Sequence, residues 1–389
     1  MIKLHEPLLC GNEWEYIKNC LDGGWVSSVG KYVDLFEKKI AKYTGAKYAV
    51  ACINGTSALQ ISLKLAGVEI DDEVIVPSLT FIAPVNAINY NNAKPIFMDN
   101  DDYYTIDVNK TIEFLNKKTR TVIRKKLPIT INKKTGNRII ALIVVHLFGN
   151  AVKLDRLFDL CKKKNIVLIE DAAESVGTFY KSGRFKNKHT GTVGKIGCLS
   201  FNGNKIITAG GGGMILTNDL NFAKKAKYLT TQAKDDPINY VHNDIGYNFR
   251  LSNIQAALGL AQLESLASHI KKKKIIHKIY KSKIDKIKRL KISRTSHSDK
   301  CNHWLNIIEI NKKFSKKDFS KIIRRLANDG IEVRPLCYPN HLQKKYNKCQ
   351  TYKLNNVKKI YRNRLCLPSS PQLTKKQQNF ICKKLDNIF

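Results

Sequence analysis

The sequence lacks the signals of several large classes of protein. Its ten cysteines include no C-x-x-C pair, so neither a zinc ribbon nor a thioredoxin-type site is readable, and we expect them to be reduced. No apolar run approaches the ~20 residues of a membrane span, and the start, MIKLHEP, lacks the apolar core of a secretory signal. No G-x-x-x-x-G-K-[ST] loop is present, which excludes a P-loop nucleotide triphosphatase. We therefore expect a soluble, cytoplasmic chain with no membrane partner and no metal site.

Acidic residues are scarce. The 32 Asp and Glu residues stand against 68 Lys and Arg, which gives a net charge of +36. Such an excess is typical of nucleic-acid-binding proteins, and that class is a rival hypothesis. The 13 arginines leave 55 lysines, which run along the whole chain beside abundant Asn and Ile, as an A/T-rich coding sequence would produce. Because no helix-turn-helix, zinc-finger or RNP motif accompanies them, we interpret the charge as coding bias on solvated faces, which would still attract a diphosphate-bearing substrate.

Apolar, strand-like runs alternate with amphipathic, helix-like stretches over the first part of the chain. The expected strands include 49–54, 73–78, 95–99, 139–146, 166–171, 197–201 and 214–217, and the expected helices include 56–66, 83–90 and 154–164. Such alternation is typical of a mostly parallel sheet covered by helices on both faces, with ligand groups at the carboxyl ends of the strands. Two basic stretches, 118–138 and 180–195, interrupt the pattern as a surface excursion and a loop.

A long helical region from Ser252 into the lysine-rich 270s leads to a second, smaller region. It contains a strand-like run at 304–310, a helix-like stretch at 316–328, the segment RPLCYPNH at 334–341 and a final helix. We predict a large α/β domain over residues 1–250 and a smaller C-terminal α+β domain over residues 251–389.

Lys205 has the most informative surroundings of any lysine in the chain. It follows the β-rich run GCLSF at 197–201 and precedes four glycines, 210–213, that lead into a further apolar run. Glycines allow close backbone approach, so the amine is placed between two expected strands as a Schiff-base lysine is. This placement indicates covalent chemistry on an aldehyde cofactor.

The apolar run IVLIED at 166–171 ends in two carboxylates, Glu170 and Asp171. At least one of them lies at a buried strand end, where a charge is costly unless it is paired. A protonated pyridine nitrogen is a suitable partner, because an Asp there keeps a pyridoxal ring an electron sink. A helix cap by Asp171, ahead of Ala172 and Ala173, explains the pattern as well.

Two further segments border the same edge of the expected sheet. Asn54-Gly55-Thr56-Ser57 stands between a strand and a helix, where free N–H groups and hydroxyls can bind phosphate, although an ordinary Thr cap is locally the commoner explanation. Phe81 follows the strand EVIV at a corner facing the expected cleft, where a ring could stack on a flat cofactor. For a lone aromatic residue, a core position is the commoner outcome.

Taken together, these fragments resemble the DegT/StrS-type nucleotide-sugar aminotransferases, which are pyridoxal-phosphate enzymes of aminotransferase fold type I. Eight collinear blocks carry the resemblance: GWVSSVGKYVDLFE, NGTSAL, EVIVPSLTF, HLFGNAVKLD, IEDAAESVGTFYKSG, LSFNGNKIITAGGGG, YNFRLSNIQAALG and RPLCYPNH. They run through nearly the whole chain, and their shared order is far more specific than any one block. The fold implied is α/β, with a mostly parallel seven-stranded sheet between helices and a smaller C-terminal α+β domain.

The resemblance implies a role for each matching position. Lys205 would form the Schiff base with pyridoxal 5'-phosphate and move the proton, and Asp171 would pair with the pyridine nitrogen. Glu174 would lie near the ring hydroxyl, and Phe81 would stack on the ring. The phosphate would be held by Thr56, Ser57 and Ser200.

Other positions are implied on the substrate side and across subunits. Asn248 would reach the phosphate of a neighbouring subunit, with Arg250 close to the substrate or donor, so that the site is shared across a homodimer. Trp25, Ser27 and His341 would border the sugar, although core or surface roles explain them equally.

Two positions depart from the family pattern. Glu174 stands where many relatives carry Gln, so its hydrogen bond to the ring hydroxyl depends on its protonation state. Many relatives carry a Glu within the glycine run, whereas all four positions of 210–213 are glycine here, so the contacts of that loop stay open. His146 matches a recurring family position, but a structural histidine explains it as well.

The implied reaction is a ping-pong transfer of an amino group from L-glutamate, leaving 2-oxoglutarate, to a nucleotide-linked ketosugar. The run from GWVSS to PSLTF resembles members that aminate C4 of a 4-keto-6-deoxyhexose, such as viosamine and perosamine synthases. We expect a UDP-linked acceptor and a 4-amino-4,6-dideoxy product, while a C3 aminotransferase and a GDP- or dTDP-linked acceptor stay open. A dehydratase on this fold would carry His at the lysine position, and a regulator would bind the cofactor without turnover. The pathway class that the family implies is glycan or surface polysaccharide assembly.

Overall fold

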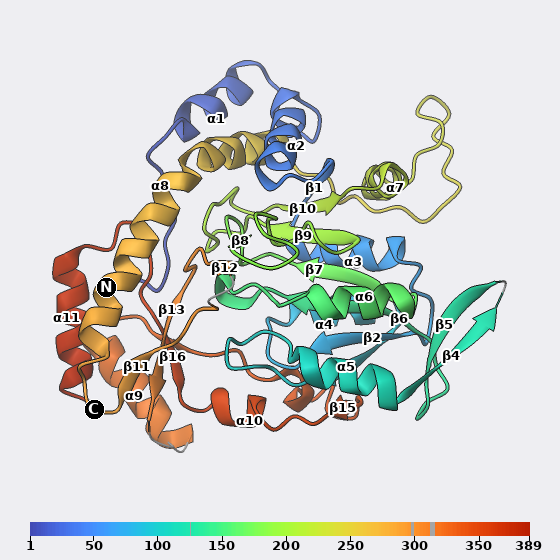
Figure 1. Cartoon of the computed structure of the whole chain (residues 1–389). Helices are drawn as coiled ribbons and strands as arrows, with labels where there is room; N and C mark the ends of the chain where they lie inside the picture. Colours follow the sequence, from blue (N-terminus) through green and yellow to red (C-terminus); the bar gives the residue numbers. More distant parts are fainter. Residues whose placement is uncertain (125, 297–298, 312–315) are drawn as a thin grey trace.

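The chain forms an eight-stranded, mostly parallel sheet between layers of helices, with a four-stranded sheet beside it (Figure 1). The computed structural model describes residues 1–124, 126–296, 299–311 and 316–389. The large sheet has the order β1-β10-β9-β7-β6-β2-β3-β15. Its parallel part comprises β2 (Glu73–Pro77), β3 (Lys94–Met98), β6 (Ile139–Val145), β7 (Val167–Asp171), β9 (Ile196–Ser200) and β15 (Thr351–Tyr352). Strand β10 (Gly213–Thr217) runs antiparallel to both β9 and β1 (Tyr48–Cys52).

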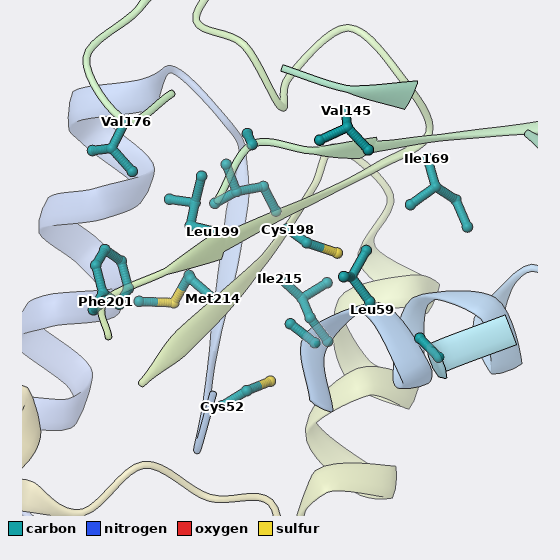
Figure 2. Close-up of a cluster of buried hydrophobic side chains, with 14 of the residues drawn as sticks. Cys52, Leu59, Val145, Ile169, Val176, Cys198, Leu199, Phe201, Met214 and Ile215 are labelled. Atoms are coloured by element: carbon teal, nitrogen blue, oxygen red, sulfur yellow. The ribbon is translucent and has the colours of Figure 1, made fainter. Parts of the chain in front are cut away.

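Helices cover both faces of this sheet because its central strands are apolar on both sides. In β6, Leu142 and Val144 belong to one core, while Ala141 and Ile143 belong to the other, as alternate side chains of a strand must. One core packs against α2 (Lys31–Thr44), α3 (Gly55–Leu65), α4 (Ala83–Tyr90) and α7 (Leu220–Thr230), and the other against α5 (Val108–Lys117) and α6 (Asp155–Lys163). Figure 2 shows the first core, where side chains of β7, β9 and β10 meet Leu59 of α3.

The C-terminal part has its own sheet and core. Helix α8 (Asn253–Ile284) begins with a capping box in which Ser252 and Gln255 satisfy each other's backbone N–H groups. It leads to the sheet β11 (Leu290–Ile292), β13 (Asn306–Ile310), β16 (Arg364–Leu367) and β14 (Arg334–Pro335). Helices α9 (Lys316–Asn328) and α11 (Lys375–Asp386) pack on this sheet around a separate apolar cluster.

Several described segments of the chain cross between the two sheets. Helix α8 makes the first crossing, and the N-terminal segment makes the second, because Ile2 forms a bridge with Ile331 and donates to the Gly330 carbonyl at 2.7 Å. Between β14 and β16 the chain goes to the large sheet as β15 and comes back. Between β11 and β13 it makes another excursion, in which β12 (Asp299–Lys300) pairs with β8 (Phe179–Tyr180). Strand β15 is the reason that the sheet has eight strands instead of the seven we expected. The division into a large domain of residues 1–250 and a smaller one of residues 251–389 stays a proposal, because the N-terminal segment and β15 each pair with the other part of the molecule.

The remaining elements are short or peripheral. They are α1 (Glu13–Asp22), β8 (Phe179–Tyr180), β12 (Asp299–Lys300), α10 (Val357–Ile360), and the 3-10 turns Leu147–Gly149 and Asn340–Leu342. The basic stretch 118–138 forms the hairpin of β4 (Thr119–Arg124) and β5 (Leu127–Asn132), which extends away from the sheet (Figure 1). All ten cysteines lie in the described part of the chain and are free. Among the described helices, none combines the length and the apolar composition that a bilayer crossing requires.

Candidate active site

Lys205 lies in the turn that follows β9, where its N–H donates to the Asn202 carbonyl at 2.9 Å. Its Nζ is 3.4 Å from Glu174 Oε1 and 4.5 Å from the ring centroid of Trp304. The amine opens into a cavity of about 290 Å³ at the carboxyl ends of the parallel strands, where open α/β sheets bind their ligands. This cavity is lined by Asn54, Gly55, Thr56, Leu59, Thr80, Phe81, Ala83, Val145, Asp171, Ala173, Glu174, Ser200, Asn202, Asn204, Lys205 and Trp304.

Asp171 ends β7 and is 5% exposed. Its Oδ1 accepts the N–H of Ala173 at 3.0 Å, but no helix begins there, so this bond belongs to a local turn and the helix-cap alternative is wrong. Burial raises the pKa of Asp171 from 3.8 to about 6, although the bond from Ala173 and the charge of Lys205 act in the opposite direction. A cationic partner in the cavity would favour the ionised carboxylate.

The neighbouring carboxylate, Glu170, does not line the cavity. Its two oxygens accept hydrogen bonds from His146 Nε2 and from the backbone N–H groups of Gly191, Val193 and Gly194. The other ring nitrogen of His146 accepts the N–H of Val152 at 3.1 Å. His146 therefore has a structural place beside β7, and both carboxylates at the strand end are buried.

Glu174 connects the lysine to the loop that follows β6. One of its oxygens approaches Lys205, and the other accepts the N–H of Phe148 at 2.8 Å. Phe148 holds a left-handed backbone with φ of 56°, which directs this N–H toward the carboxylate. Both oxygens of Glu174 are therefore engaged within the chain.

The start of α3 forms one wall of the cavity. Asn54 caps this helix by accepting the Ser57 N–H at 2.7 Å, so that N–H group is already satisfied. A Cβ on Gly55 would lie 2.9 Å from the Ser200 Cβ, so glycine is needed for this close approach of helix and strand. Thr56 and Ser200 line the cavity at the start of α3, whereas Ser57 is buried and does not line it. A helix start with hydroxyls around it is suited to a phosphate.

Two more side chains at the cavity are positioned for a ligand. Thr80 lines the cavity, and its buried hydroxyl has no hydrogen-bond partner among the described residues. Phe81 is 59% exposed at the mouth, so the core position that is commoner for such a residue is wrong here. An unpartnered hydroxyl and an uncovered aromatic face are both unfavourable unless a ligand contacts them.

These residues fit pyridoxal 5'-phosphate. Asp171 offers a buried carboxylate to a protonated pyridine nitrogen, Phe81 offers a ring face, and the start of α3 offers phosphate donors. Lys205 offers the amine. In residues 1–124, 126–296, 299–311 and 316–389, no cluster of His, Cys, Asp and Glu could hold a metal ion.

Besides Ser57, five of the residues expected at the site do not line this cavity within one chain. The carbonyls of Trp25 and Ser27 accept hydrogen bonds from Asn253, and Asn248 forms a bridge with Thr231. Arg250 lines a different hollow of about 230 Å³ near the start of α2. His341 is buried, with Nδ1 2.6 Å from the Ser78 hydroxyl and Nε2 unpartnered within the described chain.

Sequence reasoning missed Trp304, Asn204 and Thr80, all of which line the cavity. Trp304 also borders a second hollow of about 180 Å³, which continues from the first toward His5 and Arg334. The two hollows share Phe81, Glu174, Asn204 and Trp304, so together they provide room for a substrate next to the cofactor. Trp304 and Arg334 come from the C-terminal part, which no local pattern connects to Lys205.

Comparisons with known proteins identify a family that covers nearly the whole chain. The model of the DegT/DnrJ/EryC1/StrS aminotransferase family matches residues 9–386. The GDP-perosamine synthase of Caulobacter vibrioides is 34% identical over 388 residues, covering 100% of this chain and 98% of that protein. The dTDP-3-amino-3,6-dideoxy-alpha-D-galactopyranose transaminase of Aneurinibacillus thermoaerophilus is 30% identical over 364 residues, covering 92% and 90%. The crystal structure of a DegT DnrJ EryC1 StrS aminotransferase from Brucella abortus matches with a TM-score of 0.85 at 26% identity, covering 97% of this chain and 95% of that chain. The expected fold class and the expected pyridoxal-phosphate cofactor are confirmed.

Proposed function

Because the chain belongs to the DegT/DnrJ/EryC1/StrS aminotransferase family, we propose that it transfers an amino group from L-glutamate to C4 of a UDP-linked 4-keto-6-deoxyhexose. The product is a 4-amino-4,6-dideoxy sugar nucleotide of the viosamine type. Pyridoxal-phosphate-dependent transamination is common to the family, whereas the donor, the sugar and its nucleotide are specific to this proposal. The observation that carries it is the amine of Lys205, which opens into one cavity with Asp171 and the start of α3.

The proposal gives each of these residues a defined physical task. Bound pyridoxal phosphate supplies an electron sink for breaking the Cα–H bond of the amino donor. Lys205 binds the cofactor and carries the proton at Nζ, and Asp171 holds the pyridine nitrogen in its protonated form. Glu174 orients the lysine, since its second oxygen is fixed by the Phe148 N–H. The phosphate is assigned to Thr56, Ser57 and Ser200, and the ring face to Phe81.

We assign Asn248 and Arg250 to the active site of a second copy of the chain. Asn248 and Arg250 do not line the cavity of their own chain, and the loop before them exposes Ile238 (84%), Tyr240 (69%) and Ile245 (72%). Exposed apolar side chains on an extended loop are typical of a subunit contact. In a homodimer with two-fold symmetry, each chain would contribute Asn248 to its partner's phosphate site.

The choice of C4 follows from the closer relative. The GDP-perosamine synthase is 34% identical to this chain, against 30% for the transaminase named for a 3-amino sugar. The names of these two relatives contain GDP and dTDP, so both nucleotides belong in the test beside UDP. A further relative, the spore coat polysaccharide biosynthesis protein SpsC of Bacillus subtilis, is 28% identical over 383 residues, and its name supports a role in glycan assembly.

The test is a panel of UDP-, GDP- and dTDP-linked 3-keto and 4-keto sugars, each incubated with L-glutamate and full-length protein. Mass spectrometry and NMR of the products identify the sugar, the nucleotide and the aminated carbon. A 3-amino product would overturn the choice of C4. Absence of any aminated product would overturn the enzymatic proposal and favour a regulator that binds the cofactor without turnover.

The site assignment has a separate test. Borohydride reduction should fix the cofactor onto the peptide that contains Lys205, and Lys205→Ala should lower turnover by on the order of a thousandfold. Lys195→Ala is the matched control, because that lysine is half exposed and pairs with Asp219. Attachment of the cofactor to a different peptide would refute the assignment.

A further inference from the structure

Trp304 presents its ring to the amine of Lys205 from a segment far along the chain. The Lys205 Nζ lies over this ring, 4.5 Å from its centroid, within the range at which an ammonium is attracted to an indole face. The second partner of the amine is Glu174 at 3.4 Å. Trp304 is only 6% exposed, so the contact is largely shielded from water, which strengthens it.

The indole is fixed by contacts on several sides. Its Nε1–H donates to the Asn204 carbonyl at 2.8 Å, so the ring is also tied to the residue that precedes Lys205. The Trp304 backbone donates to Asn302 Oδ1 at 2.9 Å and accepts from Lys273 Nζ at 2.9 Å. The ring stacks on Phe148 with an interplanar angle of 14°. The backbone of Trp304 is therefore held in place, and its indole cannot turn away from Lys205 without losing the bond to Asn204 and the stacking on Phe148.

We propose that Trp304 is a positioning residue for Lys205, whose ring face holds the lysine ammonium whenever the amine is not bonded to the cofactor. This inference rests on the proposed role of Lys205. A free lysine side chain has four flexible carbons and many rotamers. Because most of these rotamers hold the amine away from the cofactor, they would slow its return to the cofactor after each release. The carboxylate of Glu174 and the ring of Trp304 together restrict that freedom. The hydrogen bond from the indole to the Asn204 carbonyl ties the ring to the turn that carries Lys205.

The experiment measures how readily the Lys205 amine reacts with a trace of acetic anhydride, followed by peptide mass spectrometry. Full-length protein is saturated with pyridoxamine 5'-phosphate, which occupies the site without bonding to a lysine. Trp304→Leu should raise the labelling rate of Lys205 by roughly two- to tenfold relative to the exposed Lys195, as expected for loss of one such contact. Trp304→Phe keeps a ring face and should stay closer to the unsubstituted protein than Trp304→Leu does.

The control is Trp14→Leu, since Trp14 is 79% exposed on α1 and does not line the cavity. An unchanged Lys205 rate in a folded Trp304→Leu protein overturns the proposal, and so does a Trp304→Phe rate equal to that of Trp304→Leu. If Trp304→Leu does not fold, the same labelling is carried out on unsubstituted chains that contain mono- and difluorotryptophan. Fluorine weakens the negative ring face without changing its shape, so the rate should rise along the series, and a flat series is the refuting result.

This test is separable from the proposed function. Protein that fails to bind pyridoxamine 5'-phosphate would refute the proposed function, and labelling of the ligand-free chain would still report on the contact. Protein that binds it and labels alike in every variant would refute the role of Trp304 alone.

Discussion

Lys273 should make the stability of this protein depend on pH in a way that a single substitution removes. It lies on α8 with 0% exposure, and its Nζ donates to the carbonyls of Trp304 and Ser369 at 2.9 and 2.6 Å. Burial lowers the pKa of this lysine from 10.5 to about 7. Because both partners are neutral carbonyls, neither provides the countercharge that would offset the burial of an ammonium.

The sign and size of the effect follow from proton binding. Between pH 7 and the unfolded pKa near 10.4, the unfolded chain binds one more proton at Lys273 than the folded chain, so the free energy of unfolding rises with pH. The limiting slope is about 1.4 kcal/mol per pH unit, which gives about 2 kcal/mol between pH 7 and pH 9 once partial protonation at pH 7 is included. Below pH 7 the full cost of burying the charge is present, and it disappears as the pH approaches the unfolded pKa.

Lys273→Met keeps the length of the side chain and removes the titrating group. The net change at a single pH mixes two opposing terms, namely relief of about 4 kcal/mol at pH 7 and the loss of a donor to two buried carbonyls. The pH dependence separates them, because only the first term changes with pH. Urea unfolding at a fixed protein concentration should show the variant losing about 2 kcal/mol relative to the unsubstituted protein on going from pH 7 to pH 9.

The matched control is Lys272→Met, whose lysine is the exposed neighbour on the same helix. That variant should track the unsubstituted protein across the range. A difference between Lys273→Met and the unsubstituted protein that stays constant from pH 7 to pH 9 would show that the buried lysine remains charged, and would refute the reasoning.

Three further predictions concern the strand ends and turns around the site. Asp171→Asn should weaken retention of pyridoxal phosphate roughly tenfold or more, because an amide cannot pair with a cationic nitrogen; equilibrium dialysis measures this, and unchanged retention would count against that pairing. Glu170→Gln should lower the free energy of unfolding by about 2–4 kcal/mol, since the carboxylate accepts three backbone N–H groups and the His146 ring. Burial would raise the pKa of Glu170, but these bonds hold it below 4.5, so this stabilisation is present above that pH and the difference between the two proteins should shrink as the solution is acidified. Gly177→Ala should lower the thermal midpoint more than Gly67→Ala does, because both glycines have positive φ but only the first would place a Cβ 2.3 Å from Ile270; equal shifts would contradict the steric argument.

Local patterns in the sequence predicted the elements that build the large sheet. Runs such as 139–146 and 166–171 are apolar at every position because both faces of β6 and β7 are covered, and this pattern can be read without a structure. The two-residue strand β15 could not be predicted in the same way, since it is too short to carry a period and its partner β3 lies far away in the sequence.

The candidate site likewise contains residues that local patterns predict and residues that they do not. Asp171, Lys205 and the start of α3 stand at strand ends or helix starts, so their approach to one another follows from a parallel sheet. The pattern IVLIED could not tell which carboxylate faces the cavity, because the answer depends on the His146 ring and on three N–H groups of another loop. Trp304 reaches the site only through the fold of the C-terminal part, and no sequence pattern near Lys205 predicts its contact with the lysine.

The repeated passage of the chain between the two sheets has a mechanical consequence. Two connections would allow the smaller sheet to rotate about the line that joins them. With α8, the N-terminal segment and the excursion to β15 all spanning the gap, any such rotation must bend at least one of them. The mouth between Phe81 and Arg334 should therefore widen or narrow by adjustments of loops and side chains, with the two halves of the molecule held at a nearly constant angle.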